Sequence, residues 1–242
     1  MKILLLIAFI LTFPLRSNAQ ENLKEYNPVN TFSPDLSTKT ENEIKRQYEL
    51  LEKKNLTENE KLDLDILLKK YGEVVESVWD IINMECNWYC GGGSYKVTSS
   101  SSLDSTKNNK YFAKQANDLD YRTAWVEGKE DSGIGEYIEY YFKNNSPRIT
   151  SIIISNGYFK SDNAWQNNNR VKALKLHINN VPTAILHLKD SKTDQAFEID
   201  TLGRNEDGTE LILKFEILEI YKGLKYDDTA ITEIYFDGID VH

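Results

Sequence analysis

Two cysteines form the first group of residues in this sequence that could do chemistry. Cys86 and Cys90 are the only cysteines among 242 residues, and three glycines follow them in the run CNWYCGGG. A thiol pair can make a disulfide, a redox centre or part of a zinc site, but zinc needs about four ligands. The three histidines, at positions 177, 187 and 242, lie far along the chain, which disfavours zinc. The run GGGSYK lacks the spaced glycines and the Lys-Ser/Thr pair of a phosphate-binding loop.

The N-terminal residues predict the compartment in which these thiols reside. Lys2 precedes an apolar run over 3–15, and small residues end at Ala19, which is the pattern of a cleaved signal peptide. A membrane anchor is the alternative, but a helix that spans a bilayer needs about 20 apolar residues. We therefore expect residues 1–19 to be removed and the mature chain to be secreted or periplasmic, with no transmembrane segment.

Export favours a disulfide between Cys86 and Cys90, because thiols are oxidised outside the reducing cytoplasm. Residues four positions apart on a regular helix keep their Cβ atoms about 6 Å apart, which is too far for a disulfide. The bridge therefore requires a turn, and the glycines at 91–93 permit one. We predict a structural corner at which the chain turns from helices into strands.

The charge of the chain narrows the partners that it could have. The formal net charge is −9, and loss of Lys2 and Arg16 with the signal peptide lowers it to −11. An acidic surface repels nucleic acids and anionic membranes. Neutral or cationic partners are therefore favoured, and no nucleic-acid partner is expected.

A polar loop carries the second group of candidate residues. The run NGYFKSDNAWQNNNR, at 156–170, gathers five side chains of ligand-binding type: Tyr158, Lys160, Trp165, Asn167 and Arg170. An aromatic face can stack on the apolar face of a pyranose, while amides or an arginine hold its hydroxyls. We therefore expect this loop to contact a carbohydrate. The alternative is an ordinary Asn-rich loop whose Trp165 packs into the edge of the domain.

A second polar and aromatic loop could line the same end of the domain. It contains Tyr221, Lys222, Tyr226 and the acidic pair at 227–228. Trp88 and Trp125 differ from Trp165, because they stand beside a cysteine or within a strand pattern, and we expect both in the core.

Helices precede these loops in the chain. Thr40 with Glu43, and Thr57 with Glu60, fit the capping box, in which a hydroxyl caps an amide three residues on and the acid reaches back. Each box predicts the start of a helix.

These helices form a hairpin over 39–83, after a linker or extended arm over 20–38. The second helix would carry apolar residues at three-to-four spacing as far as Ile81. A two-helix hairpin has little core of its own. We therefore expect its apolar stripe to dock on the domain that follows, with binding of another exported protein as a second possibility.

The remaining chain has a period of two. Seven short runs rich in β-branched and aromatic residues are separated by Asn, Asp, Gly and Lys: 136–142, 149–155, 170–178, 183–188, 195–199, 210–221 and 231–236. Strands with no helix between them predict a mainly β fold, an antiparallel sandwich or jelly roll. The alternation also places His177 and His187 on solvent-facing sides of their strands.

Several runs, in order, resemble one family. They are CNWYCGGG, RTAWVEG, GIGEYIEYYF, NGYFKSDNAWQNNNRVK and IYKGLKYDDTAITEIYFDG, and they extend over about 84–242. This part of the chain resembles the discoidin-like domains, also called coagulation-factor type C or galactose-binding-like jelly rolls. It is most similar to the module that accompanies a streptococcal NAD glycohydrolase and serves glycan binding and toxin translocation. The resemblance implies a jelly-roll sandwich that binds a ligand through loops at one end.

The resemblance also implies a place for a structural calcium ion. In relatives with a metal, an acidic turn and a carboxylate near the last strand supply the ligands, and Asp118, Asp120, Thr123 and Glu233 match those places. Calcium takes oxygen ligands of these kinds. The usual Asp-Gly turn is here Asp120-Tyr121, however, and the alternative is a turn in which each Asp hydrogen-bonds its own backbone.

No catalytic motif stands out in the chain: it has no nucleophile elbow, no paired-histidine metal motif and no Cys-His arrangement. The sequence therefore favours a secreted, non-catalytic protein that binds a glycan or glycoconjugate and needs no cofactor beyond the calcium ion that the resemblance allows. The alternatives are a secreted hydrolase that uses an Asp and Glu pair on glycans, and a scaffold that binds another exported protein through the helical hairpin.

Overall fold

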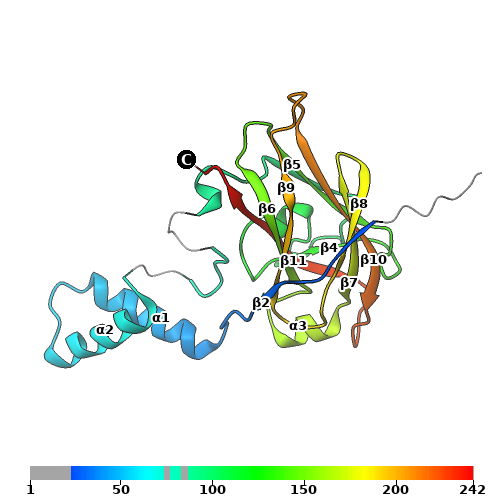
Figure 1. The fold of residues 1–242 in the computed structure, drawn as a ribbon. Coiled ribbons are helices and arrows are strands. Elements are labelled where there is room, and N and C mark those ends of the chain that lie inside the picture. Colours follow the sequence, from blue (N-terminus) through cyan, green and yellow to red (C-terminus); the bar gives the residue numbers. More distant parts are fainter. Residues whose placement is uncertain (1–22, 74–76, 83–86, 242) are drawn as a thin grey trace, which may run out of the picture.

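The computed structural model describes residues 23–73, 77–82 and 87–241. They form a sandwich of two β-sheets, from which a helical hairpin projects (Figure 1). The predicted signal peptide and Cys86 lie outside the described residues. No described helix is both long enough and apolar enough to cross a membrane.

The two sheets are almost wholly antiparallel. The six-stranded sheet has the order β1 (Lys24–Tyr26), β8 (Val181–His187), β7 (Arg170–Ile178), β10 (Leu211–Tyr221), β5 (Tyr137–Phe142) and β3 (Lys96–Ser99). The five-stranded sheet has the order β2 (Asn30–Phe32), β9 (Asp194–Leu202), β6 (Arg148–Asn156), β11 (Ala230–Ile239) and β4 (Trp125–Val126). Among the strand pairs of the described residues, β1 and β8 alone run parallel. The predicted mainly β, antiparallel jelly-roll class is confirmed, and each of the seven predicted runs overlaps a strand.

The core lies between the sheets and follows from the alternation in the sequence. In β5, Ile138, Tyr140 and Phe142 are buried while the residues between them are only partly covered. The facing sheet contributes a matching apolar set: Ile152, Ile154, Phe197, Ile234 and Phe236. Trp88 and Trp125 are buried, as expected, and both belong to this core. Such a core is rigid enough to hold the loops at its ends in fixed positions.

The N-terminal arm covers one edge of each sheet. Strand β1 pairs with β8, and β2 pairs with β9. Lys24 also pairs with Asp200, and Glu25 with His187. The described part of the predicted arm, residues 23–37, is therefore extended up to the start of α1, and its strands protect sheet edges that would otherwise be open to pairing.

The helical hairpin consists of α1 (Thr38–Glu52) and α2 (Glu58–Tyr71), which pack on each other. Leu50 of α1 and Leu67 of α2 are buried. The predicted capping box of Thr57 and Glu60 is present. The first helix instead begins one turn early, because Ser37 rather than Thr40 caps it. A backbone N–H group in the first turn of each helix is therefore hydrogen-bonded by a side chain next to the helix.

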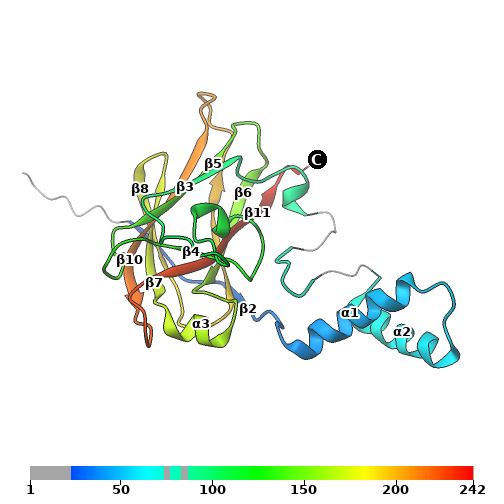
Figure 2. The same ribbon diagram turned by 180° about the vertical axis from the view of Figure 1, so that it is seen from behind.

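The hairpin does not use its apolar stripe to dock on the sandwich. The second helix ends at Gly72, which has a φ of 84° that favours glycine, and so Ile81 is not part of it. Leu62 and Ile66 are 62% and 56% exposed, and Figures 1 and 2 show the helices standing away from the sheets. The expected docking of this stripe is therefore wrong, since Leu62 and Ile66 lie on an exposed face of α2.

A short segment after the hairpin does contact the sandwich. Ile81 donates its backbone N–H to the carbonyl of Leu119 at 3.0 Å, and Tyr121 donates to the carbonyl of Trp79 at 2.9 Å. The Trp79 indole reaches back to Glu41 of α1 at 3.4 Å. The loop at 119–121 thus anchors the base of the hairpin.

His177 corrects one expectation from the strand pattern. It lies on the outer face of β7, but it is only 6% exposed, because the neighbouring strands place Pro182 and Lys214 opposite it. Its Nε2 contacts a carboxylate oxygen of Glu216 at 2.9 Å. Burial lowers the pKa of His177, and the bond to Glu216 opposes that shift. His187 is partly exposed, as expected.

The run WYC forms a short 3-10 turn, Trp88–Cys90, at the start of the sandwich. The Gly92 backbone approaches the Trp88 ring so closely that a Cβ there would lie 2.6 Å from it. This explains the need for glycine at the predicted corner. Cys90 is exposed, and no disulfide joins it to another described residue. The pairing with Cys86 therefore remains a prediction.

Candidate functional site

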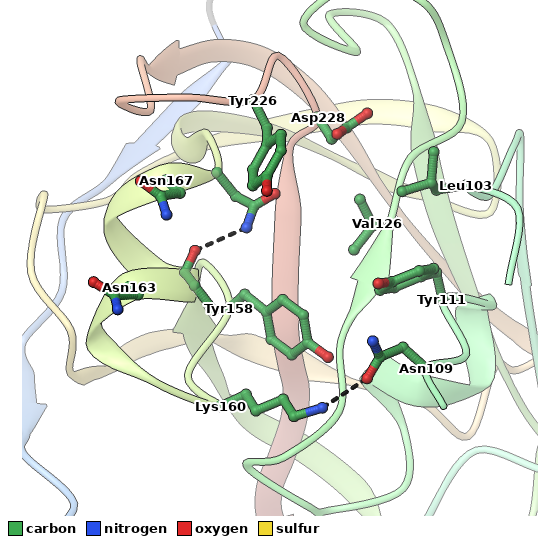
Figure 3. Close-up of a pocket in the computed structure, with 12 residues that line it drawn as sticks. Leu103, Asn109, Tyr111, Val126, Tyr158, Lys160, Asn163, Asn167, Tyr226 and Asp228 are labelled. Atoms are coloured by element: carbon green, nitrogen blue, oxygen red, sulfur yellow. Dashed lines mark hydrogen bonds between the residues drawn. The ribbon is translucent and has the colours of Figure 1, made fainter. Parts of the chain in front are cut away.

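A pocket of about 470 Å³ opens at the end of the sandwich that carries α3 (Asp162–Asn167). Figure 3 shows its walls, which come from four segments far apart in the sequence. Twelve residues line it: Leu103, Asn109, Tyr111, Val126, Tyr158, Lys160, Asn163, Ala164, Asn167, Asn168, Tyr226 and Asp228. Four of the eight predicted ligand residues belong to this set, namely Tyr158, Lys160, Asn167 and Tyr226.

The floor of the pocket is aromatic and apolar. The Tyr158 and Tyr111 rings meet edge to face, with centroids 6.4 Å apart. Together with Leu103, Val126 and Ala164 they belong to a small apolar cluster that is separate from the main core. Burial raises the pKa of Tyr158 to about 12, with a smaller contribution from Tyr111. The phenol is therefore neutral at physiological pH and can donate a hydrogen bond.

Strand β11 fixes Tyr158 through its backbone. The buried Thr232 hydroxyl donates to the carbonyl of Gly157 at 2.7 Å and accepts from the N–H of Phe159 at 2.8 Å. Gly157 has a φ of 94°, which favours glycine. The chain therefore turns at Gly157, and both peptide groups that flank Tyr158 are held by one side chain.

Besides the tyrosine hydroxyls, the polar side chains of the pocket are amides with one cation and one anion. Lys160 donates to Asn109 at 2.6 Å, and Asn168 donates to the carbonyl of Ala164 at 2.8 Å (Figure 3). Asp228 lies at the opposite rim from Lys160. Partial burial raises the pKa of Asp228, and the nearby Asp227 raises it further. The arrangement offers donors at one side, an acceptor at the other, and an apolar floor between them.

The other predicted loop residues are held by the protein itself. Trp165 donates its indole N–H to the carbonyl of Asn156 at 2.9 Å. The buried Arg170 donates to both carboxylate oxygens of Asp190, at 2.9 and 3.0 Å. Tyr221 donates to the carbonyl of Leu188 at 3.0 Å. None of these three belongs to the residues that line the pocket.

Lys222 also lies outside the lining residues, and it pairs with Asp227. Leu103, Asn109 and Tyr111, by contrast, were not expected at the site. They come from the loop after β3, where no periodic pattern points to them. The closely spaced polar and aromatic residues Asn108, Asn109 and Tyr111 were the only available signal.

The predicted calcium residues form a separate cluster beside β11. The Thr123 hydroxyl lies 2.7 Å from an Asp118 carboxylate oxygen, 3.1 Å from the Gln115 carbonyl and 3.2 Å from the Asp120 carbonyl. Glu233 is fully buried, and its Oε2 accepts the backbone N–H of Leu119 at 2.7 Å. The Asp120 carboxylate turns away and binds the Arg122 guanidinium at 2.6–3.0 Å. Its carbonyl, not its carboxylate, therefore faces the cluster.

This cluster has an excess of hydrogen-bond acceptors. One Thr123 hydroxyl cannot donate to three oxygens at once, and Oε1 of Glu233 and Oε1 of Gln115 are buried without a hydrogen-bond partner. Burial raises the pKa of Glu233 well above its usual value, and Asp118 raises it further. Among the described residues, no group of three or more His, Cys, Asp and Glu side chains is placed to hold a metal. Two carboxylates with neutral oxygens nonetheless fit a hard cation.

Comparisons with known proteins give one family match and several similar solved structures. Residues 88–237 match the family of the NAD glycohydrolase translocation F5/8 type C domain. No curated protein matches the chain at a significant level. Among solved structures, the chain is similar to CpGH89CBM32-5 from Clostridium perfringens, in complex with GalNAc-β-1,3-galactose, at 16% identity and a TM-score of 0.40. That match covers 59% of this chain and 94% of the other.

A second similar structure holds the CBM32-1 and CBM32-2 domains of Clostridium perfringens ZmpB, at 13% identity and a TM-score of 0.43, over 76% of this chain and 51% of that one. Another is the arabinofuranosyltransferase AftD from Mycobacteria, at 18% identity and a TM-score of 0.39, over 60% of this chain and 11% of that one. The family match covers well over half of the sequence. The chain therefore belongs to the family of NAD glycohydrolase translocation F5/8 type C domains.

Proposed function

We propose that this protein is an exported, non-catalytic binding module that recognises a glycan through the pocket beside α3. The observation that carries the proposal is the composition of the pocket, which combines three tyrosines and four asparagines with one lysine and one aspartate. A sugar ring presents apolar C–H faces together with hydroxyls that donate and accept. Aromatic floors surrounded by amides suit that chemistry.

The family supports a role in binding or translocation, since it is described as a translocation domain. We propose that the module attaches an exported protein to a glycoconjugate, and that secretion depends on the predicted signal peptide. The hairpin is a second candidate for contact with an exported partner, because Leu62 and Ile66 remain exposed there.

A glycan hydrolase is the less favoured alternative. Most such enzymes use two carboxyl groups on either side of the scissile bond, about 5 to 10 Å apart. Asp228 is the only acidic residue among those that line the pocket. The acids near Asp228, which are Asp227 and Glu127, do not line the pocket. A single carboxylate in the lining suits recognition of hydroxyls better than hydrolysis.

The proposal is tested by nuclear magnetic resonance titration of the mature chain with methyl glycosides of galactose, glucose, N-acetylgalactosamine and N-acetylglucosamine, after a glycan array. We expect at least one sugar to shift the amide signals of Tyr158, Asn167 and Tyr226. Binding that leaves these signals unmoved would place the site elsewhere, and no binding on the array would contradict a glycan ligand. Turnover of aryl glycosides or of NAD would instead favour an enzyme.

We also propose that a calcium ion completes the cluster beside β11. Asp118, Thr123 and Glu233 would hold it with the carbonyls of Gln115 and Asp120, and the ion would neutralise the buried Glu233 and the partly buried Asp118. The support is the excess of acceptors and the unpartnered oxygen of Glu233. Such an ion would stabilise the loop at 115–123.

A further inference from the structure

We infer that Asn169 is a positioning residue, which clamps the loop 222–229 onto the end of α3 and thereby fixes Tyr226 and Asp228 in the pocket. The role of the pocket rests on the proposed function, whereas the clamp itself rests only on contacts between described residues. Asn169 lies just beyond α3, is fully buried, and does not line the pocket.

Every hydrogen-bonding group of Asn169 is directed at this one loop or at the strand that follows it. The side-chain Nδ2 donates to the Asp227 carbonyl at 2.5 Å, and Oδ1 accepts from the Gly223 N–H at 2.8 Å. The backbone N–H donates to the Asp228 carbonyl at 2.9 Å, and the carbonyl accepts from Ala230 at 3.2 Å. One buried residue thus holds both ends of the loop.

Burial of apolar side chains does little to hold the loop. Leu224 is 78% exposed, and Tyr226 is 43% exposed. Further hydrogen bonds run to α3, since Leu224 donates to the Gln166 carbonyl at 2.9 Å, and Lys225 and Tyr226 donate to the Asn167 carbonyl at 3.2 and 2.8 Å. The last residue of the loop, Thr229, donates to Glu127 at 3.1 Å and to the Ser132 carbonyl at 2.7 Å. A segment with few buried apolar contacts opens easily once its hydrogen bonds are lost. The loop therefore depends on hydrogen bonds, with Asn169 at their centre.

The surroundings of Gly223 show how closely the loop approaches the end of α3. A Cβ on Gly223 would lie 2.4 Å from the Asn167 carbonyl oxygen and 2.5 Å from the Asn168 carbonyl carbon. Any larger residue would push the loop away. The short approach brings Tyr226 and Asp228 to the same pocket as the Asn167 and Asn168 side chains, which makes the site pre-organised for a ligand.

The chain offers a matched control for Asn169. Asn156 is also a fully buried asparagine that accepts one backbone N–H and donates to one carbonyl, but both belong to Val171 in β7. Asn156→Ala leaves two buried backbone groups of a core strand without partners. It should therefore lower the melting temperature at least as much as Asn169→Ala, but without releasing the loop.

Amide hydrogen exchange on the mature chain tests the clamp without any ligand. In Asn169→Ala we expect Gly223, Lys225 and Tyr226 to exchange about tenfold faster than in the wild type, as loss of about one net hydrogen bond implies. In Asn156→Ala these amides should keep their wild-type rates. Unchanged rates in Asn169→Ala, or equal acceleration in both variants, would overturn the inference.

Gly223→Ala gives a second route if Asn169→Ala does not fold, since it displaces the loop while Asn169 is retained, and it should accelerate the same amides. The methyl glycoside that shifts Tyr226 most in the wild type should bind each loop variant at least about fivefold more weakly, with little change for Asn156→Ala. Equal weakening in both asparagine variants would reduce Asn169 to a general stabilising role. If no glycoside binds the wild type, the proposed function fails, while the exchange rates still decide the clamp.

Discussion

The guanidinium of Arg170 lies over the ring of Trp165, with its central carbon 4.6 Å from the ring centre. The two residues that the sequence offered as a stacking ring and a cation for a ligand therefore contact each other. Arg170 also binds Asp190 with two hydrogen bonds, in a largely buried position. These contacts join α3 to the loop between β8 and β9. They therefore help to hold α3, which forms one wall of the pocket, in its position.

Trp165→Ala should consequently lower stability rather than binding alone. The variant loses a half-buried ring, the hydrogen bond to Asn156 and the contact with Arg170. We expect the free energy of unfolding to fall by about 2 kcal/mol, measured by urea denaturation. Trp165→Phe should keep most of the packing and lose less. A wild-type unfolding curve for Trp165→Ala, together with lost glycan binding, would restore the ring as a ligand contact.

The longer strands were predictable from the sequence because their alternation reflects burial of one face. Strands β3 and β4, of four and two residues, fall outside the predicted runs, because they are too short to show an alternation. Strands β1 and β2 were not predictable, because each has three residues and mostly exposed side chains. Their positions depend on pairing with β8 and β9, which lie more than 150 residues further along.

The candidate site was predictable only in part. A local cluster of aromatic and amide residues identified Tyr158, Lys160, Asn167 and Tyr226. It could not show which rings face outward, because Trp165 turns inward toward a partner carbonyl and Arg170. The opposite wall, with Asn109 and Tyr111, is brought near by the sandwich and has no local signature. Asn169 had no local signature for the same reason, because the residues that it hydrogen-bonds lie more than 50 positions further along the chain.

Tyr226→Ala should weaken glycan binding by about 1 to 3 kcal/mol if its ring contacts the sugar. The ring is 43% exposed and lines the pocket, so its removal should leave the melting temperature almost unchanged. Tyr48→Ala is the matched control, because Tyr48 is 51% exposed but lies on α1. Titration with the same methyl glycoside measures both. Equal affinities for the two variants would remove Tyr226 from the site.

The double variant Leu62→Glu and Ile66→Glu should have nearly the same stability as the wild type, because both side chains are exposed on α2. Leu67→Glu is the control, since Leu67 is 5% exposed between the two helices, and it should melt the hairpin. Helix content by circular dichroism and the melting temperature report the outcome. A large loss in the Leu62 and Ile66 variant would show that the hairpin is packed against the sandwich in solution.

Glu233→Gln tests whether Glu233 binds a structural calcium ion or is a buried carboxylate without a ligand. The amide can still accept the Leu119 N–H, but it carries no charge. Without calcium, the variant should be at least as stable as the wild type at neutral pH, because no buried charge remains. Added calcium should raise the melting temperature of the wild type only. An equal rise in both proteins would place the ion elsewhere.

The pH dependence of the same pair follows from the raised pKa of Glu233. A carboxyl whose pKa is higher in the folded state binds its proton more tightly there, so protonation stabilises the fold relative to the unfolded chain. That stabilisation is complete below the usual value of 4.5 and is lost as the pH rises through the folded pKa. In calcium-free buffer, the wild type should therefore lose stability relative to Glu233→Gln as the pH rises from about 5 to 8.

The effect of His177 on the pH dependence of stability has the opposite sign. Its lowered pKa makes the fold less stable as the pH falls through the usual histidine pKa of 6.5. Both proteins contain His177, so this contribution cancels in the difference between their unfolding free energies. Calcium should abolish the loss at high pH, because it binds the ionised carboxylate and its affinity rises as the proton leaves. Urea denaturation at several pH values, with and without calcium, measures the difference. A difference that does not change with pH would mean that Glu233 titrates alike in the folded and unfolded chain.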